Sequence, residues 1–149
     1  MPVHLASLND LDELTPLFAD YLAFYEVPRS LSEVRAFLAQ RLDQSDSVLL
    51  MARDAAGEAQ GFIQLYPIFN SLELQPAYLL NDLFVSPQAR RQGVAEALMN
   101  AARAHAESTG VCGLQLETAK TNLAGQALYE KLGYVRDQVF YTYWLSLKP

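Results

Sequence analysis

The chain has 149 residues, of which 51% are hydrophobic, and its formal net charge at pH 7 is −6. This length allows one domain with a substantial core and is short for two ordinary domains, so we expect a single domain over residues 1–149. The acidic charge disfavours nucleic acid as a partner, because binding its phosphates needs a basic surface. The only clustered basic residues in the sequence are Arg90 and Arg91. The same charge is compatible with a cationic small molecule.

The cysteine and histidine content limits which cellular compartment and which metal cofactors we expect for this chain. The single cysteine, Cys112, cannot form an internal disulfide, and its alternation with Leu114 and Leu116 predicts a buried, inert thiol. Two histidines, His4 and His105, are too few for a zinc site, so no metal is expected. The chain shows no signal-peptide pattern and no apolar run near the roughly 20 residues of a membrane span. We therefore expect a cytoplasmic protein without membrane contact.

The first part of the chain predicts a strand and two helices. Val3–Ala6 is a short strand pattern, and apolar residues then recur at three- and four-residue spacing from Leu11 to Tyr25. Pro16 is expected to kink or restart this first helix. The capping-box pattern Ser30-Leu-Ser-Glu33 predicts that a second helix begins there and runs to about Leu42.

The middle of the chain predicts three strands followed by a helix. Ser47–Arg53 and Gln60–Ile68 form a plausible hairpin. Tyr78–Val85 is rich in branched and aromatic residues and ends at Ser86-Pro87, because proline cannot donate to a strand ladder. From Val94 the apolar period becomes helical.

The last part predicts a strand, a short helix and a final strand. The strand covers about Val111–Thr118, and the helix begins near Asn122 and ends before Gly133. The final strand, Gln138–Leu147, is apolar on nearly both faces. The element order β-α-α-β-β-β-α-β-α-β is an α+β pattern.

The turn between the strand that ends at Val85 and the helix that begins at Val94 has the composition of an anion site. It reads Arg90-Arg91-Gln92-Gly93-Val94-Ala95 and lies at a helix N-terminus, where backbone N–H groups lack intrahelical partners and the macrodipole is positive. Phosphate groups bind at such positions, and Gly93 permits the backbone to approach a bulky anion. A solvated basic turn that caps the helix also explains this pattern when it is taken alone.

A second pattern, later in the chain, makes the first more specific. Asn122, Ala124, Tyr129, Gly133 and Tyr134 fit the pattern Asn…Ala…(Leu/Phe)-Tyr-x-x-x-Gly-(Phe/Tyr). Together with the Arg-x-x-Gly-x-Ala turn, this pairing resembles the GNAT superfamily of N-acetyltransferases. The resemblance covers the chain well from about Ser47 onward and the earlier part only by element order.

The strand before the turn resembles one group within that family. It reads Leu80-Asn81-Asp82-Leu83-Phe84-Val85, close to the Leu-Glu-Asp-(Leu/Ile)-(Tyr/Phe)-Val of spermidine/spermine and related small-amine N-acetyltransferases. Asn81 stands where that group has a glutamate, which puts any substrate contact of that position in doubt.

The resemblance implies a fold and an activity. The fold would be a single mixed, mostly antiparallel sheet with about four helices, splayed where the fourth and fifth strands part. The activity would be transfer of the acetyl group of acetyl-CoA to a primary amine, by direct attack in a ternary complex. A homodimer is expected. Two other readings stay open, a protein or peptide N-acetyltransferase and a non-catalytic acyl-CoA-binding module.

The resemblance also assigns residues to acetyl-CoA. Backbone amides of about Arg91 to Ala95 would hold the diphosphate, and the backbone N–H of Phe84 or Val85 would polarise the thioester carbonyl. Tyr129 occupies the general-acid position, although a core tyrosine also explains it. The expected cofactor-binding residues are Phe84, Val85, Arg90, Arg91, Gln92, Gly93, Val94, Ala95, Asn122, Ala124 and Tyr129.

Proton removal and acceptor binding point to acidic residues. Asp82 shares a strand face with Phe84 by the period of two and is the first candidate base, with Glu117 the second. An ordinary ion pair for Asp82 and a solvent-facing Glu117 remain alternatives. The segment between the first two helices offers acidic and aromatic groups for an alkylammonium, or else core tyrosines and solvated carboxylates. The expected substrate-binding residues are Asp20, Tyr25, Glu26, Asp82 and Glu117.

Overall fold

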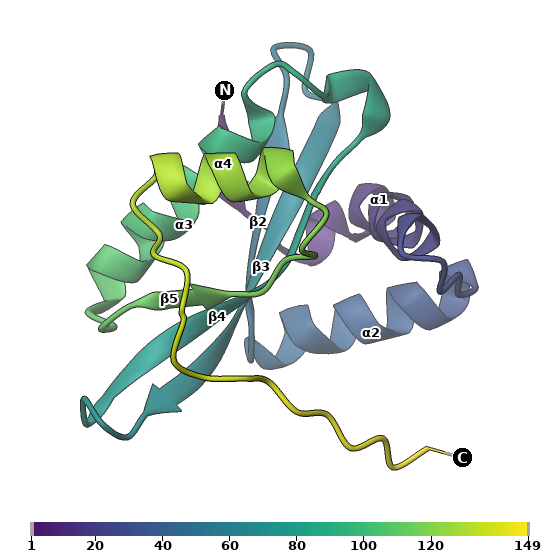
Figure 1. Ribbon diagram of the computed structural model, residues 1–149. Coiled ribbons are helices and arrows are strands. Elements are labelled where there is room, and N and C mark those ends of the chain that lie inside the picture. The colour runs from purple at the N-terminus through teal and green to yellow at the C-terminus, as the bar shows by residue number, and fades with distance from the viewer. Residues whose placement is uncertain (1, 149) are drawn as a thin grey trace. The chain divides into compact units, whose positions relative to one another are not determined.

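The computed structural model describes residues 2–148, and the chain divides into two compact units, Met1–Glu117 and Thr118–Pro149. The described residues contain five strands and four α-helices, with short 3-10 turns at Leu8–Asp10 and Pro87–Ala89. In chain order they are β1 (Val3–Leu5), α1 (Leu11–Phe24), α2 (Leu31–Gln44), β2 (Val48–Arg53), β3 (Ala59–Asn70), β4 (Gln75–Val85), α3 (Val94–Thr109), β5 (Leu114–Leu116) and α4 (Leu123–Lys131) (Figure 1).

The sheet lies in the first unit and has the order β1-β2-β3-β4-β5. Neighbouring strands are antiparallel except β4 and β5, which are parallel. This confirms the predicted α+β fold with a mixed, mostly antiparallel sheet. The ladder between β4 and β5 runs from Tyr78 with Leu114 to Leu80 with Leu116. Because that ladder ends at Leu80, the last residues of β4 continue beyond it toward the turn at 86–93.

The core of the first unit lies between the sheet and the helices α1 and α2. Its buried members are Leu11, Leu14, Leu17, Phe18, Val34, Leu38, Leu49, Met51, Phe62 and Phe84. Helix α3 contacts β2, β3 and β4 from the opposite side, so helices cover both faces. A Cβ at Gly61 would lie 2.6 Å from the carbonyl oxygen of Phe84 and 3.3 Å from Leu98 Cδ1, so glycine is needed for this close packing.

Strand β4 contains one extra residue. Gln64 is paired with Asp82, whereas the next residue of β3, Leu65, is paired with Leu80. Asn81 is therefore left without an opposite residue on β3, which is a β-bulge. It lies where the β4–β5 ladder ends, and bulges often occur beside functional sites.

The predicted start of the second helix is confirmed, and the prediction for the first is wrong in part. Ser30 Oγ accepts from the backbone N–H of Glu33, whose carboxylate accepts from the N–H of Ser30, and α2 begins at the next residue. Helix α1 continues through Pro16 without a restart. Pro16 removes one bond, to the carbonyl of Asp12 in the first turn, and both residues are exposed, so that carbonyl can be hydrated.

The predicted final strand, Gln138–Leu147, is not formed. Its side chains are exposed, with Tyr141 at 90% and Trp144 at 89% of their accessible surface. Residues 118–148 contain the helix α4 and no strand, so within this unit the segment has no strand to pair with. A strand pattern predicts an extended conformation, but pairing depends on a neighbour.

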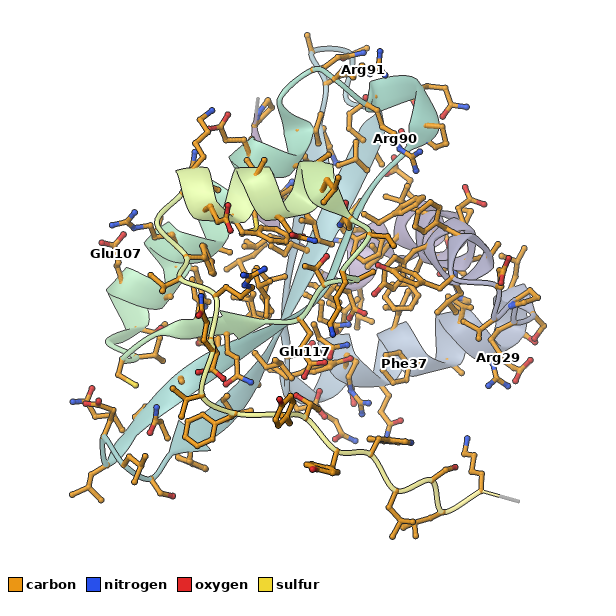
Figure 2. All side chains as sticks on the ribbon, in the orientation of Figure 1. Arg29, Phe37, Arg90, Arg91, Glu107 and Glu117 are labelled. Carbon is orange, nitrogen blue, oxygen red and sulfur yellow. The ribbon has the colours of Figure 1, made fainter. Side chains whose placement is uncertain are left out.

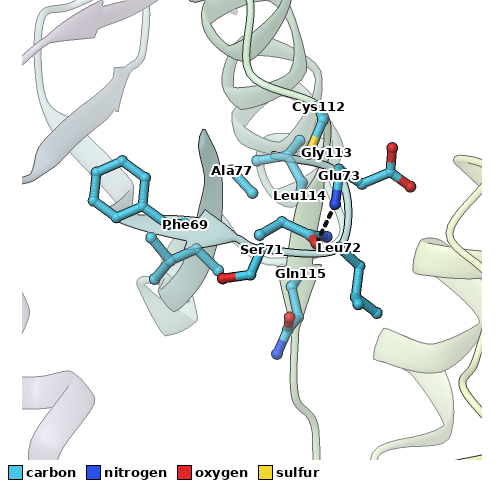
Figure 3. A pocket seen from close by; sticks show the side chains of 11 residues that line it. Phe69, Ser71, Leu72, Glu73, Ala77, Cys112, Gly113, Leu114 and Gln115 are labelled. Atoms are coloured by element: carbon cyan, nitrogen blue, oxygen red, sulfur yellow. Dashed lines mark hydrogen bonds between the residues drawn. The ribbon is translucent and has the colours of Figure 1, made fainter. Parts of the chain in front are cut away.

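Cys112 is exposed, so the predicted buried thiol is wrong. Strand β5 begins only at Leu114, and Cys112 therefore precedes the alternating segment. It lines a hollow of about 560 Å³ between the tip of the β3–β4 hairpin and the start of β5 (Figure 3). This hollow lies at the opposite end of β4 from the 86–93 turn. Among residues 2–148, no helix is long and apolar enough to cross a membrane.

Candidate active site

The 86–93 turn has the backbone geometry that an anion site requires. Gly93 is the N-cap of α3 with φ +78°, a left-handed conformation in which an L side chain is strained. No described atom beyond its chain neighbours lies within 4 Å of the place where a Cβ would be. The first-turn amides of α3 start at Val94 and have no intrahelical acceptors. Free amides and open space beside them suit a bulky anion such as a diphosphate.

The two arginines of the turn have different surroundings. Arg90 Nε donates to the carbonyl of Val85 at 3.2 Å, and its guanidinium lies 5.7 Å from the ring centres of both Phe24 and Phe84. Arg90 thus braces the turn against α1 and β4. Arg91 is exposed at the tip of the turn, with φ +63° (Figure 2). Permanent positive charge at the tip suits an anionic ligand.

Asp82 is the buried acidic residue of this region, with 5% of its surface exposed. Its Oδ1 accepts from Tyr21 Oη at 2.8 Å and from Asn81 Nδ2 at 3.1 Å, and its Oδ2 accepts from Gln64 Nε2 at 2.7 Å. These bonds offset the free-energy cost of burying a carboxylate. The structure therefore places Asp82 on the α1 side of the sheet, as the period of two predicts.

Gln64 is a member of this network that the sequence analysis missed. It is fully buried, and its Oε1 accepts from Ser47 Oγ at 2.8 Å while its Nε2 lies 3.2 Å from Tyr66 Oη. The signal available in the sequence is one amide within the apolar run of residues 61–65, because buried polar side chains are nearly always hydrogen-bonded. The sequence gives no indication of which partner Gln64 has.

The two tyrosines nearest Asp82 remain neutral phenols. Burial, followed by the negative charge of Asp82, raises the pKa of Tyr21 far above its ordinary value. The same two causes raise the pKa of Tyr66 to about 12. Near neutral pH, Tyr21 therefore acts as a hydrogen-bond donor to Asp82 and not as a base.

The predicted acceptor residues are only partly brought together. Tyr25 is 57% exposed, and its ring centre lies 5.2 Å from that of Tyr21. Tyr21 is the residue whose hydroxyl donates to Asp82. Asp20 and Glu26 are exposed at the end of α1 and just after it. Glu117 is exposed immediately after β5 (Figure 2).

The second unit positions Tyr129 on α4. Asn122 caps this helix, since its Oδ1 accepts from the N–H of Gly125 at 3.1 Å and its Nδ2 donates to Thr118 Oγ1 at 3.0 Å. Tyr129 is half-buried, and its ring lies 6.2 Å from that of Tyr134. The backbone N–H of Tyr134 donates to the carbonyl of Tyr129 at 2.9 Å. Ala124 is exposed in the first turn.

Comparison with known proteins shows the family. Residues 14–134 match the Acetyltransferase (GNAT) family, so the chain belongs to the GNAT family. It is an acetyl-CoA-dependent N-acetyltransferase, and acetyl-CoA is the co-substrate that the family implies. Among residues 2–148, no group of three or more His, Cys, Asp or Glu residues could hold a metal ion.

Three relatives place the chain within the family. An uncharacterized N-acetyltransferase of Bacillus subtilis, YhfO, is 40% identical over 99% of this chain and 98% of its own length. A probable acetyltransferase of Haemophilus influenzae is 31% identical over 69% of this chain and 70% of its own. The crystal structure of a probable acetyltransferase superposes with a TM-score of 0.94 at 37% identity, covering 100% of this chain and 99% of that one.

Proposed function

We propose that this enzyme acetylates a primary amine of a small cationic molecule, by direct attack on acetyl-CoA in a ternary complex. The observation that carries this proposal is the buried carboxylate of Asp82, which is hydrogen-bonded to neutral donors and forms no ion pair among residues 2–148, beside the point where β4 leaves the β5 ladder. An ammonium group is the substrate feature that such a carboxylate attracts. The strand Leu80–Val85 also resembles that of the small-amine group, which supports the same substrate class.

The cofactor end of the proposed site is built largely from backbone. The amides of Arg91 to Ala95 would bind the diphosphate, and Gly93 would allow it to come close. The backbone N–H of Phe84 or Val85 would donate to the thioester carbonyl oxygen as negative charge develops there. Support comes from the β4–β5 ladder, which ends before these residues. Asn122 and Ala124 are proposed to contact coenzyme A from α4.

Proton transfers accompany the acetyl transfer. An ammonium with a pKa of about 10.4 has no lone pair, so Asp82 is proposed to accept its proton directly or through water, with Glu117 as the second candidate. The amine nitrogen then bonds to the acetyl carbon, gives up a second proton to solvent, and the carbon–sulfur bond breaks. Tyr129 is proposed to give its proton to the departing thiolate, whose thiol has a pKa of about 8.5.

The acidic mouth of the site is proposed to hold a second positive charge of the acceptor. Asp20 and Glu26 lie exposed around Tyr25, whose exposed aromatic face suits an alkylammonium. The whole chain carries a net charge of −6, which favours approach of cations. We further propose that the protein acts as a single-domain cytoplasmic homodimer.

The test is release of free coenzyme A thiol from acetyl-CoA with a panel of polyamines, amino acids, aminoglycosides and peptides, with Asp82→Asn as the control enzyme. The proposal expects turnover of di- and polyamines that falls strongly in Asp82→Asn. Preferential turnover of peptides would instead support a peptide acetyltransferase. Acetyl-CoA binding without turnover of any acceptor would support a non-catalytic acyl-CoA-binding module.

A further inference from the structure

We propose that Gln64 and Tyr21 are positioning residues that hold the Asp82 carboxylate ionised and oriented to receive the proton of the acceptor ammonium. The inference rests on the proposed role of Asp82 and extends it to two residues that do not themselves take part in proton transfer. Their own part is to fix one carboxylate oxygen each.

The two donors come from different elements and bind different oxygens. Gln64 lies directly across from Asp82 in the β3–β4 register, and its Nε2 is 2.7 Å from Oδ2. Tyr21 reaches from α1, and its Oη is 2.8 Å from Oδ1. With one bond fixed by the sheet and one by the helix, the carboxylate plane has a single favourable orientation.

Gln64 is itself held in the orientation that presents its N–H₂ group. Ser47 donates to Oε1 at 2.8 Å, so the amide oxygen is occupied on the side away from Asp82. A flipped amide would bring its oxygen against the carboxylate, which only accepts, whereas the Ser47 hydroxyl can bind either end of the amide. Asp82 therefore fixes the orientation of Gln64, and the hydrogen bonds run in one direction from Ser47 through Gln64 to Asp82.

Both donors are uncharged, which matters for the acceptor. Tyr21 of α1, Tyr25 just after α1 and Tyr66 of β3 face Asp82 and its partners, and Tyr21 and Tyr66 stay neutral phenols. Arg41 of α2 and Asp46 just after it are the other charged groups that act on Tyr66. An arginine at this place would cancel the charge of Asp82. Neutral donors instead stabilise the carboxylate and leave its negative charge for an ammonium.

Loss of either donor should shift the pH dependence in one direction. Hydrogen bonds to a carboxylate favour its charged form, so removing one favours the protonated form. Activity that needs the ionised carboxylate is lost at low pH. The acidic limb of kcat/KM should therefore move to higher pH in Gln64→Glu and in Tyr21→Phe. Gln64→Glu should move it further, by about one to two pH units, because it also sets a second carboxylate against Oδ2.

The experiment compares pH profiles of kcat/KM for one diamine in the wild type, Gln64→Glu, Tyr21→Phe and the control Tyr78→Phe. Tyr78 is a buried β4 tyrosine that lies against His105 of α3, so its variant loses a hydroxyl away from Asp82. The control should keep the wild-type limb. An equal loss of kcat/KM at every pH, with the limb unmoved, would mean that Gln64 and Tyr21 are only structural.

A second variant separates packing from the location of the charge. Asp82→Asn combined with Gln64→Glu keeps the volumes and a hydrogen bond across the strands, so it should fold as the wild type does, which thermal unfolding checks. It moves the carboxylate to β3, and we expect it to stay at the activity of Asp82→Asn. Recovery of activity would overturn the inference, since the position of the carboxylate would then not matter. A wild type with no acidic limb would overturn the role of Asp82 itself.

Discussion

The two ends of the proposed site in the first unit are formed by different chemical groups, backbone amides at one end and side chains at the other. At the 86–93 turn the groups proposed to face the ligand are backbone amides, and the feature that shapes them is the φ of +78° at Gly93. Around Asp82 they are side chains, joined by three hydrogen bonds of 2.7 to 3.1 Å. The turn is open, whereas Asp82 is 5% exposed.

This difference separates what each end can tolerate. A backbone site accepts most side-chain changes and fails when the backbone conformation is lost. A side-chain network fails when one donor becomes an acceptor, even if the volume is kept. Changes at the turn should therefore appear in the affinity for acetyl-CoA, and changes near Asp82 in the rate and its pH dependence.

The largest expected effect is a loss of kcat at Tyr129, and it tests whether changes in rate and changes in acetyl-CoA affinity can be separated. If it is the general acid, Tyr129→Phe keeps the ring and loses the proton, so kcat should fall by roughly 10² to 10⁴-fold. The variant should therefore change the rate and leave the affinity for acetyl-CoA, measured by calorimetry, unchanged. An unchanged kcat, under conditions where chemistry limits the rate, would reassign Tyr129 to packing.

Gly93→Glu should weaken acetyl-CoA binding at the 86–93 turn, where the proposed ligand-binding groups are backbone amides. The left-handed φ costs an L residue roughly 1–2 kcal/mol, and the new carboxylate would face the diphosphate, so acetyl-CoA affinity should fall by about 100-fold or more. The matched control is Gly57→Glu, which has φ +87° and open space in the β2–β3 turn. It carries the same strain away from the site and should bind acetyl-CoA normally in calorimetry. Equal affinities of the two variants would remove the turn from the cofactor site.

Glu26→Gln should give the smallest effect. It tests whether Glu26 recognises a second positive charge of the acceptor. Exposed charge pairs contribute roughly 0.2–1 kcal/mol, so KM for a diamine should rise a few-fold while KM for a monoamine of similar length stays constant. Added salt should narrow the difference by screening. The control is Glu107→Gln on α3, an exposed glutamate 3.7 Å from Arg103 (Figure 2). Equal changes for both amines would show that Glu26 does not recognise the second charge.

The sequence predicted those parts of the fold and site that depend on local chemistry. The Ser30 and Glu33 capping box located the start of α2, and Gly93 marked the start of α3. The last helix was predicted to begin near Asn122, and the structure confirms this start, since Asn122 caps α4 through its bond to Gly125. Each of these depends on neighbours within about four residues, where composition and conformation are closely linked.

Features that depend on distant pairing were missed. The Tyr21–Asp82 bond joins residues 61 positions apart, and nothing in either segment specifies the other. Gln64 reads as one polar residue in an apolar strand until the register places it opposite Asp82. The exposure of Cys112 and the unpaired segment 138–147 likewise depend on where ladders begin and which strands are available.

The bulge at Asn81 sets the phase of every later side chain in β4. Alternation has a period of two, so one added residue transfers each following side chain to the opposite face of the sheet. Leu80 pairs with Leu65, whereas Asp82 pairs with Gln64 on the α1 side. If β4 alternated regularly from Leu80 onward, Asn81 would lie opposite Gln64 and the Asp82 carboxylate would turn toward the apolar side beneath α3. The bulge thus decides which of two neighbouring polar side chains, Asn81 or Asp82, is buried opposite Gln64, without any substitution at either position.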